Sequence, residues 1–202
     1  MMNEQDRLRR DFFNQHAAAW EERCYSPKVR EGLEKFVVDF DVKPATRVLD
    51  VGCGSGVLVP YLRHYLGANG EIIELDQSPE MLKYATQKES SHLFCLCASV
   101  ESIPLIDEYV DQVICFACFP HFSDKAQAVR EIARVLRKGG LMVIAHMANR
   151  EELNRHHAGS NAVMHDCLPP DEVIKSLIED ACLELVSFEE RPGRFLIKAR
   201  KR

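Results

Sequence analysis

Residues 46–56 read TRVLDVGCGSG, a short apolar segment that leads directly into three glycines at alternate positions. β-Branched and aliphatic residues dominate the apolar segment, and such residues favour a strand that is buried on both faces. Glycines at 52, 54 and 56 let the backbone pass close to a ligand and present its N–H groups. The stretch therefore predicts a buried strand that ends in a ligand-binding turn.

Short apolar runs alternate with segments of helical periodicity on both sides of this turn. Helices are predicted over 29–40, 57–66 and 123–137, after Ser78-Pro79-Glu80, and after Pro169-Pro170-Asp171. Lys138-Gly139-Gly140 is predicted to stop the helix over 123–137. Strands are predicted over 46–51, 71–76, 92–97, 110–116, 141–146, 183–190 and 194–199. This order indicates an α/β fold with a Rossmann-like, doubly wound, mostly parallel seven-stranded sheet and an antiparallel C-terminal hairpin strand.

The composition is that of an ordinary globular domain with a small acidic excess. The chain has 202 residues, with 26 Lys+Arg against 31 Asp+Glu and a formal net charge of -5. This balance argues against a protein that coats nucleic acid, because such proteins usually carry a basic surface. No apolar stretch approaches the ~20 residues of a membrane helix, and the amino terminus lacks the apolar core of a signal peptide. We expect a single cytoplasmic domain over 1–202 whose eight cysteines are free thiols.

Two aspartates flank the glycine turn in the predicted sheet. Asp50 ends the first strand, and Asp76 ends the second, where a carboxylate can accept both hydroxyl groups of a ribose. A nicotinamide-binding loop would place a third glycine where Val57 stands, which disfavours a nicotinamide oxidoreductase. Under the alternative interpretation, the glycines serve tight packing and Asp50 is a helix cap.

Four ordered motifs resemble those of class I S-adenosylmethionine-dependent methyltransferases. VLDVGCGSG (48–56) resembles their first motif and EIIELDQSPEML (71–82) their second. VESIPLIDEYVDQVICF (100–116) resembles the loop after the third strand and the fourth strand, and REIARVLRKGGLMVIAH (130–146) the helix and strand that follow. The likeness runs from about residue 12 to the carboxyl end. FFNQHAAAW (12–20) is similar to the amino-terminal segment of the small-molecule and quinone-biosynthesis branch.

The resemblance implies S-adenosyl-L-methionine as the cofactor. The glycines would line its methionine moiety, Asp50 would order its amino group, Asp76 would hold its ribose, and Phe116 would lie beside the sulfonium. The resemblance also implies a helical lid over 1–40, a cofactor-binding core over 41–146, a substrate-side loop over 147–168, and a helix and hairpin over 169–202. The implied cofactor contacts are Asp50, Gly52, Gly54, Gly56, Asp76, Gln77, Met81, Ser99, Val100 and Phe116.

One of these positions departs from the family pattern. Many relatives carry an aspartate on the loop after the third strand, where it contacts the adenine amino group. Alignment through Ile103-Pro104 places Ser99 there, with Val100 next to it. This change weakens the adenine contact or moves it to the backbone.

Methyl transfer from a sulfonium is an in-line displacement, so the protein mainly has to align the reactants in a dry pocket. Aromatic faces can stabilise the sulfonium cation, and the amino-terminal segment supplies Phe12, Phe13, Trp20 and Tyr25. The alternative is that these rings anchor the core.

The acceptor is expected to be a small molecule. Methyltransferases that act on base amines often carry Asn/Asp-Pro-Pro-Tyr/Phe after the fourth strand, whereas this chain reads CFACFPH over 115–121. The basic residues over 198–202 form a charged tail of the kind that is usually solvated. We therefore expect neither a nucleic-acid nor a membrane partner, and the sequence indicates no oligomeric state.

Cysteines and histidines gather in the loops on the predicted acceptor side. Cys115 and Cys118 form a Cys-x-x-Cys pair that would suit a metal or a thiophilic substrate. A single pair is weak evidence, so no metal ligand is assigned. Instead, His121, His146 and His157 are the candidate substrate contacts or general bases.

Two functions stay open at this point. The motif set favours an active methyltransferase for a small-molecule acceptor. The alternative is a cofactor- or metal-responsive binding module on the same fold, without turnover.

Overall fold

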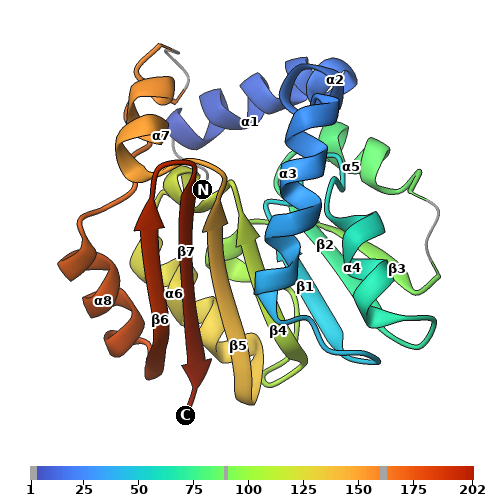
Figure 1. The fold of residues 1–202 in the computed structure, drawn as a ribbon, viewed down its shortest axis with the longest axis vertical. Coiled ribbons are helices and arrows are strands. Elements are labelled where there is room, and N and C mark those ends of the chain that lie inside the picture. The colour runs from blue at the N-terminus through green and yellow to red at the C-terminus, as the bar shows by residue number, and fades with distance from the viewer. Residues whose placement is uncertain (1–3, 89–90, 160–162) are drawn as a thin grey trace.

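The computed structural model describes residues 4–88, 91–159 and 163–202 (Figure 1). In these ranges seven strands form one sheet in the order β3-β2-β1-β4-β5-β7-β6. The strands are β1 (Arg47–Val51), β2 (Glu71–Asp76), β3 (Leu93–Cys97), β4 (Val110–Phe116), β5 (Leu136–His146), β6 (Leu183–Arg191) and β7 (Arg194–Lys201).

The strand directions confirm the predicted fold class. β1 pairs in parallel with β2 and β4, and β3 and β5 extend the parallel sheet on either side. β7 runs antiparallel to both β5 and β6, so the antiparallel strand lies one position in from the edge, and β6 forms the edge itself. The strand order reverses between β1 and β4, which is where sheets of this kind bind ligands.

Helices cover both faces of the sheet, and α1 crosses its end (Figure 1). α3 and α4 pack on one face through Leu33, Phe36 and Leu62, whereas α6 and α8 pack on the other through Ile132 and Ile178. In the described ranges, no helix combines the length and the apolar character of a membrane span. The helices are α1 (Glu4–His16), α2 (Trp20–Cys24), α3 (Pro27–Val37), α4 (Val59–Leu66), α5 (Pro79–Ala85), α6 (Lys125–Val135), α7 (Arg150–His157) and α8 (Asp171–Asp180).

The junction of α6 and β5 differs from the prediction. The helix ends at Val135, and Lys138, Gly139 and Gly140 belong to the strand that follows. Leu136 is fully buried in an extended conformation and pairs with Val110, so tertiary pairing ends the helix before the glycines are reached.

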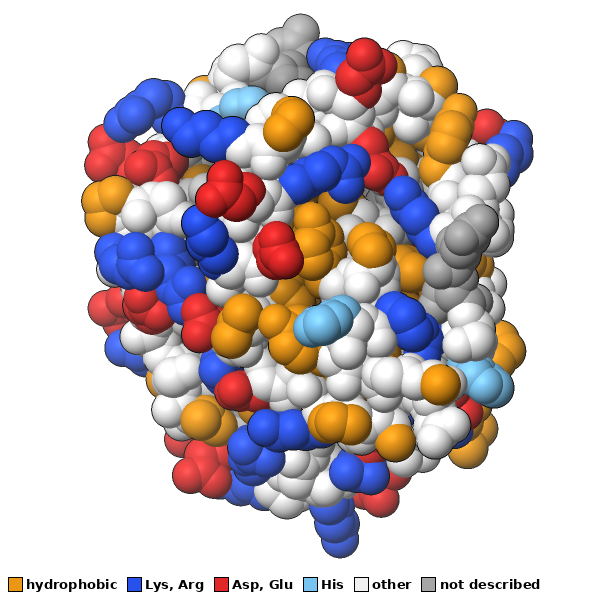
Figure 2. Space-filling view, turned by 45° about the vertical axis from the view of Figure 1, so that its right-hand side comes forward, with side chains coloured by type: hydrophobic (Ala, Val, Ile, Leu, Met, Phe, Trp, Pro, Cys, Tyr) orange, Lys and Arg blue, Asp and Glu red, His pale blue; other side chains and the backbone are white. Residues whose placement is uncertain are grey.

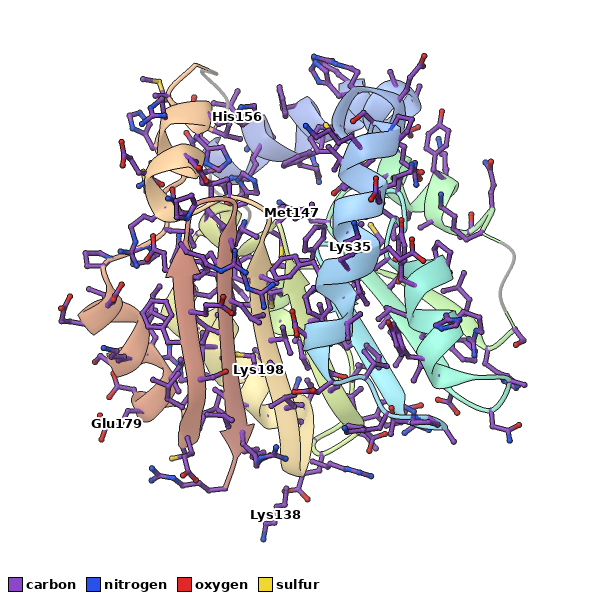
Figure 3. The ribbon with its side chains drawn as sticks, in the orientation of Figure 1. Lys35, Lys138, Met147, His156, Glu179 and Lys198 are labelled. Atoms are coloured by element: carbon purple, nitrogen blue, oxygen red, sulfur yellow. The ribbon has the colours of Figure 1, made fainter. Side chains whose placement is uncertain are left out.

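The segment after β5 lies at the carboxyl ends of the parallel strands. Figure 3 shows Met147 and His156 at this end of the sheet, with Lys138 at the opposite end. α7 begins with a capping box, in which Asn149 and Glu152 each accept a hydrogen bond from the other's backbone N–H. Figure 1 shows α7 beside α1 over this end of the sheet.

All eight cysteines are free, as predicted. Those on the glycine turn and on or just after β4 are buried, whereas Cys24, Cys97, Cys167 and Cys182 are exposed. The chain thus holds both protected and accessible thiols.

Candidate active site

A cavity with an empty volume of about 960 Å³ opens at the carboxyl ends of β1, β2 and β4. The glycine turn forms one of its walls, and side chains of the amino-terminal helices cover it. Hydrophobic side chains also gather in a hollow on the face drawn in Figure 2, where acidic and basic side chains are interspersed around it. Its lining combines apolar and aromatic walls with a few polar groups, as small-molecule sites do.

The glycine turn is shaped by close contacts to its neighbours. Gly52 and Gly54 have φ values of +63° and +56°, a region that favours glycine. A Cβ atom on Gly52 would lie 2.5 Å from the Cβ atom of Cys118, which follows β4. At Gly54 the nearest atoms to such a Cβ would be 3.8 Å away or farther, so the turn is open there.

Asp76 joins the two loops that border the cavity. Its Oδ2 accepts a hydrogen bond from the Gly54 N–H at 2.9 Å, and its Oδ1 accepts one from the Ser78 N–H at 2.7 Å. Burial raises the pKa of Asp76, although these two hydrogen bonds act in the opposite direction. The carboxylate is therefore fixed at the mouth of the glycine turn.

Two other carboxyl groups lie beneath the turn without partners. Asp50 and Glu74 are paired across β1 and β2, and neither has a hydrogen bond to its carboxyl oxygens among the described residues. Burial is the main cause that raises the pKa of both groups. Asp50 borders the cavity and Glu74 does not. The orphaned oxygens of Asp50 therefore suit a ligand that brings a donor.

The predicted cofactor residues gather around this cavity with one exception. Gly56 is not among the lining residues, and a Cβ atom there would lie 3.1 Å from Cα of Ala85 on α5. This glycine allows the turn to pack against α5. The predicted residues that line the cavity are Asp50, Gly52, Gly54, Asp76, Gln77, Met81, Ser99, Val100 and Phe116.

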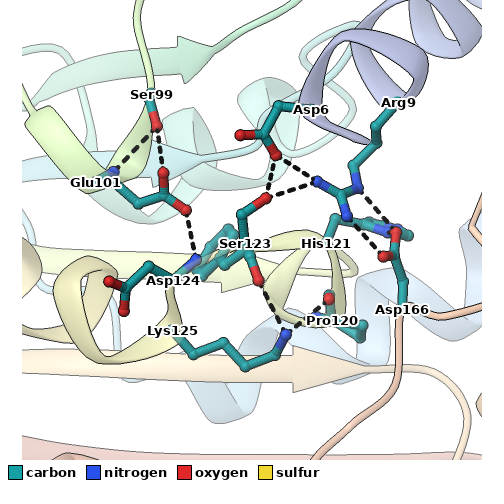
Figure 4. Close-up of polar contacts among 11 residues, drawn as sticks. Asp6, Arg9, Ser99, Glu101, Pro120, His121, Ser123, Asp124, Lys125 and Asp166 are labelled. Carbon is teal, nitrogen blue, oxygen red and sulfur yellow. Dashed lines mark hydrogen bonds and ion pairs between the residues drawn. The ribbon is translucent and has the colours of Figure 1, made fainter. Parts of the chain in front are cut away.

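Ser99 is held at the cavity wall by the short turn that follows it. Its Oγ accepts a hydrogen bond from the Glu101 N–H at 3.2 Å. Glu101 also lines the cavity, and its Oε1 accepts a hydrogen bond from the Asp124 N–H at 2.8 Å (Figure 4). Sequence reasoning missed Glu101.

The aromatic residues of the amino-terminal segment divide between the cavity and the helix surface. Phe13, Trp20 and Tyr25 line the cavity, whereas Phe12 packs on His16 with ring centroids 4.3 Å apart. Phe13 makes edge contacts with Trp20 at 5.4 Å and with His121 at 5.5 Å. A row of aromatic groups thus crosses from the glycine turn to His121.

The three predicted histidines differ in their access to the cavity. His121 lines it, and its Nδ1 lies 2.7 Å from Oδ2 of Asp166. His157 stacks beside His121 with ring centroids 5.0 Å apart and donates through Nδ1 to the Asp166 carbonyl at 2.5 Å. His146 is buried without a hydrogen bond to any described residue, and burial lowers its pKa to about 3. Neither His146 nor His157 is among the residues that line the cavity.

A family model described as "Methyltransferase domain" matches residues 49–144, which contain the glycine turn and Asp76. The matched segment is just under half of the chain, and it is similar to methyltransferase domains. S-adenosylmethionine is the cofactor that this likeness and the motifs imply.

Curated methyltransferases match the central part of the chain. An uncharacterized methyltransferase of Schizosaccharomyces pombe is 36% identical over 120 residues, which cover 59% of this chain and 45% of the relative. The ubiquinone/menaquinone biosynthesis C-methyltransferase UbiE of Proteus mirabilis is 32% identical over 108 residues. These residues cover 51% of this chain and 43% of that relative. The chain therefore spans less than half the length of these relatives.

Solved methyltransferase structures share the fold over nearly the whole chain. A chain in the complex between the Haloferax volcanii Trm112 methyltransferase activator and a methyltransferase superposes with a TM-score of 0.79 at 21% identity, covering 93% of this chain and 96% of that one. A methyltransferase from Aquifex aeolicus has a TM-score of 0.69 at 23% identity, and the superposition covers 87% of this chain and 98% of that one.

The Cys-x-x-Cys pair lies in the protein interior. Cys115 belongs to the core, and Cys118 donates from Sγ to the Val51 carbonyl at 3.0 Å. Burial raises the pKa of the Cys118 thiol well above its usual range. Within the part of the chain that the structure describes, no three His, Cys, Asp or Glu side chains converge to hold a metal ion. Cys118 thus serves as a packing partner of Gly52.

Two further residues that contact the cavity wall were missed by sequence reasoning. Arg9 on α1 donates to Asp166 through Nε at 2.9 Å and through Nη2 at 2.7 Å (Figure 4). Both side chains are 4% exposed. The two residues stand 157 positions apart, so no local sequence signal connects them.

Proposed function

We propose that this protein transfers a methyl group from S-adenosylmethionine to a small-molecule acceptor. The observation that carries the proposal is the partnerless Asp50 carboxyl group on the wall of a cavity whose mouth holds the fixed Asp76 carboxylate. When bound, S-adenosylmethionine supplies an electrophilic methyl group on a positively charged sulfur.

The residues of the glycine turn fit this cofactor. Asp50 would accept hydrogen bonds from its ammonium group, which satisfies oxygens that have no partner in the described protein. Gly54 leaves room for its methionine chain, and Asp76 would accept from the ribose hydroxyls. Met81 and Val100 provide apolar surfaces for the adenine ring, while Phe116 lies at the end of β4.

The acceptor side favours a small and partly apolar molecule. Phe13, Phe122 and Trp20 form apolar walls, and His121 and Ser123 add polar groups. The interspersed charges on the face drawn in Figure 2 form no basic stripe of the kind that tracks a nucleic-acid backbone. We infer that residues 1–40 act as a lid and that residues 147–168 border the acceptor; of these, residues 1–3 and 160–162 lie outside the described residues.

Asp76→Ala is expected to weaken S-adenosylmethionine binding at least about 100-fold, because it removes the ribose acceptor and releases the Gly54 N–H. Isothermal titration calorimetry measures the effect on the full chain. Asp180→Ala is the matched control, since Asp180 is an exposed aspartate that accepts from Ser176 on α8. A wild-type chain that does not bind the cofactor contradicts the proposed function.

Turnover separates an enzyme from a binding module. Wild type is expected to form S-adenosylhomocysteine with at least one member of a panel of small hydroxyl, thiol, amine and activated-carbon acceptors. Cofactor binding without product formation across that panel would instead support the binding module.

A further inference from the structure

Asp166 forms the centre of a buried polar cluster that joins three distant parts of the chain. It accepts two hydrogen bonds from Arg9 on α1 and one from His121, which follows β4 (Figure 4). Its backbone carbonyl accepts a further hydrogen bond from His157 on α7. Two side chains therefore fix the Asp166 carboxylate and a third holds its backbone, next to His121 on the cavity wall.

The ionisation of Asp166 determines which nitrogen of His121 carries the proton. Burial raises the pKa of Asp166, but the hydrogen bonds from His121 and Arg9 outweigh it and lower the pKa to about 2. A carboxylate that has lost its proton can only accept, so Nδ1 of His121 must be the donor. In the neutral ring, Nε2 then holds the lone pair, and it has no hydrogen bond to any described residue.

The loop that carries His121 is also held in place. Lys125 donates from Nζ to the carbonyl groups of Pro120 and Phe122, each at 2.9 Å. The two carbonyl groups flank His121 in the chain, so Lys125 holds the backbone on either side of this residue. Phe13 makes an edge contact with the ring, and the centroid of the His157 ring lies 5.0 Å from it.

We propose that His121 takes a proton from the acceptor through Nε2 and that Asp166, held by Arg9, is the residue that positions it. This inference rests on the proposed methyl transfer and names its acceptor class: a molecule whose nucleophilic atom is a neutral hydroxyl or thiol. An acceptor of this kind gains from a base, because its anion is a far better nucleophile than the neutral group.

The chemical step is balanced without a further reactant. The acceptor oxygen or sulfur forms a bond to the methyl carbon, and the electron pair of the methyl–sulfur bond passes to the sulfonium sulfur. The acceptor proton moves to Nε2 of His121. The products are a methyl ether or thioether, neutral S-adenosylhomocysteine and an imidazolium ring whose charge faces the Asp166 carboxylate.

Arg9 connects this base to the helix that covers the cavity. Its guanidinium also donates to Asp6 at 2.9 Å and to Ser123 at 3.0 Å, and both residues line the cavity. The arrangement around His121 is therefore complete only when α1 is seated. If α1 moved away, each carboxylate oxygen of Asp166 would lose its hydrogen bond from Arg9.

Asp166→Asn tests the positioning role, with Asp171→Asn as a matched control that removes an ion pair to Arg150 away from the cavity. With the best acceptor of the panel, we expect kcat to fall about 100-fold while the Kd for S-adenosylmethionine changes less than about threefold.

Nitrogen NMR of the histidine rings gives a test that needs no acceptor. In the neutral form, His121 of wild type is expected to carry its proton on Nδ1, and Asp166→Asn should raise the population protonated on Nε2. Arg9→Lys should raise the population of His121 protonated on Nε2 by a smaller amount, because lysine keeps the positive charge but loses the two-point contact with Asp166. The exposed His64 ring serves as the control, and its ring-nitrogen signals should be the same in wild type and in both variants.

Double substitution distinguishes positioning from general damage. If Asp166 acts through His121, adding Asp166→Asn to His121→Gln should lower kcat little further. If the double variant instead loses kcat by the product of the two single losses, the proposal is overturned. An unchanged tautomer of His121 in Asp166→Asn would also overturn it. Absence of cofactor binding in wild type would contradict the proposed function instead, so the two failures can be told apart.

Discussion

Gly52→Ala is expected to lower the free energy of unfolding by about 3 kcal/mol. Two costs combine at this position. The φ value of +63° lies in the left-handed region, where a side chain costs about 1 kcal/mol. The added Cβ atom would lie 2.5 Å from the Cβ atom of Cys118, and overpacking of this kind costs about 1–3 kcal/mol. Urea unfolding of the two chains measures the difference.

Gly54→Ala is the matched control, because its φ value is +56° but no atom comes within 3.8 Å of the added Cβ. Gly54→Ala should lower the free energy of unfolding by about 1 kcal/mol. The additional loss in Gly52→Ala then measures the cost of the contact with Cys118. Adding Cys118→Gly to Gly52→Ala should restore part of the lost stability, whereas Cys118→Ala keeps the clashing Cβ and should restore little. Equal costs at the two glycines would show that the contact is not the cause.

Glu74→Gln is expected to stabilise the protein by about 2 kcal/mol at pH 8. Glu74 is fully buried, and burial is the main reason that its pKa rises from 4.5 to about 8, with the nearby Cys53 thiol acting in the opposite direction. Between these two values the unfolded chain has released the proton and the folded chain still holds it. Stability therefore falls as the pH rises through this interval, by at most ~5 kcal/mol. A glutamine cannot ionise and avoids this loss, although its buried amide offsets part of the gain.

Thermal unfolding between pH 5 and pH 8 checks this effect. Wild type should lose stability over the interval, and Glu74→Gln should show a smaller loss. Glu184→Gln on β6 is the control, because Glu184 is an exposed strand glutamate. A Glu74→Gln chain that is less stable than wild type at pH 8, or that keeps the same pH dependence, would contradict the prediction.

The fold was predictable because it depends on local patterns. The run of β-branched residues before Gly52 marks β1, and Ser78 with Pro79 marks the start of α5. The end of α6 was not predictable in the same way. Leu136 continues the apolar periodicity of the helix, but its pairing with Val110 on β4 determines its conformation.

The candidate site was predictable on the cofactor side and incomplete on the acceptor side. The turn and Asp76 lie close together in sequence and carry recognisable spacing. By contrast, Asp166 lies in a polar segment and Arg9 in a charged helix, where neither residue type is unusual. Their burial becomes evident only when the ends of the chain are brought together, so sequence reasoning found His121 without the group that orients it.

The pairing of Arg9 with Asp166 also bears on how the protein acquires its site during synthesis. The two residues are 157 positions apart. At about 5–20 residues per second, a ribosome needs roughly 8–30 s to proceed from one codon to the other. Arg9 thus leaves the ribosome long before its partner, and the parallel core can form while α1 still lacks its anchor. The acceptor half of the cavity can therefore form only after β1 to β5 have been synthesised, whereas β6 and β7 still follow Asp166 in the chain.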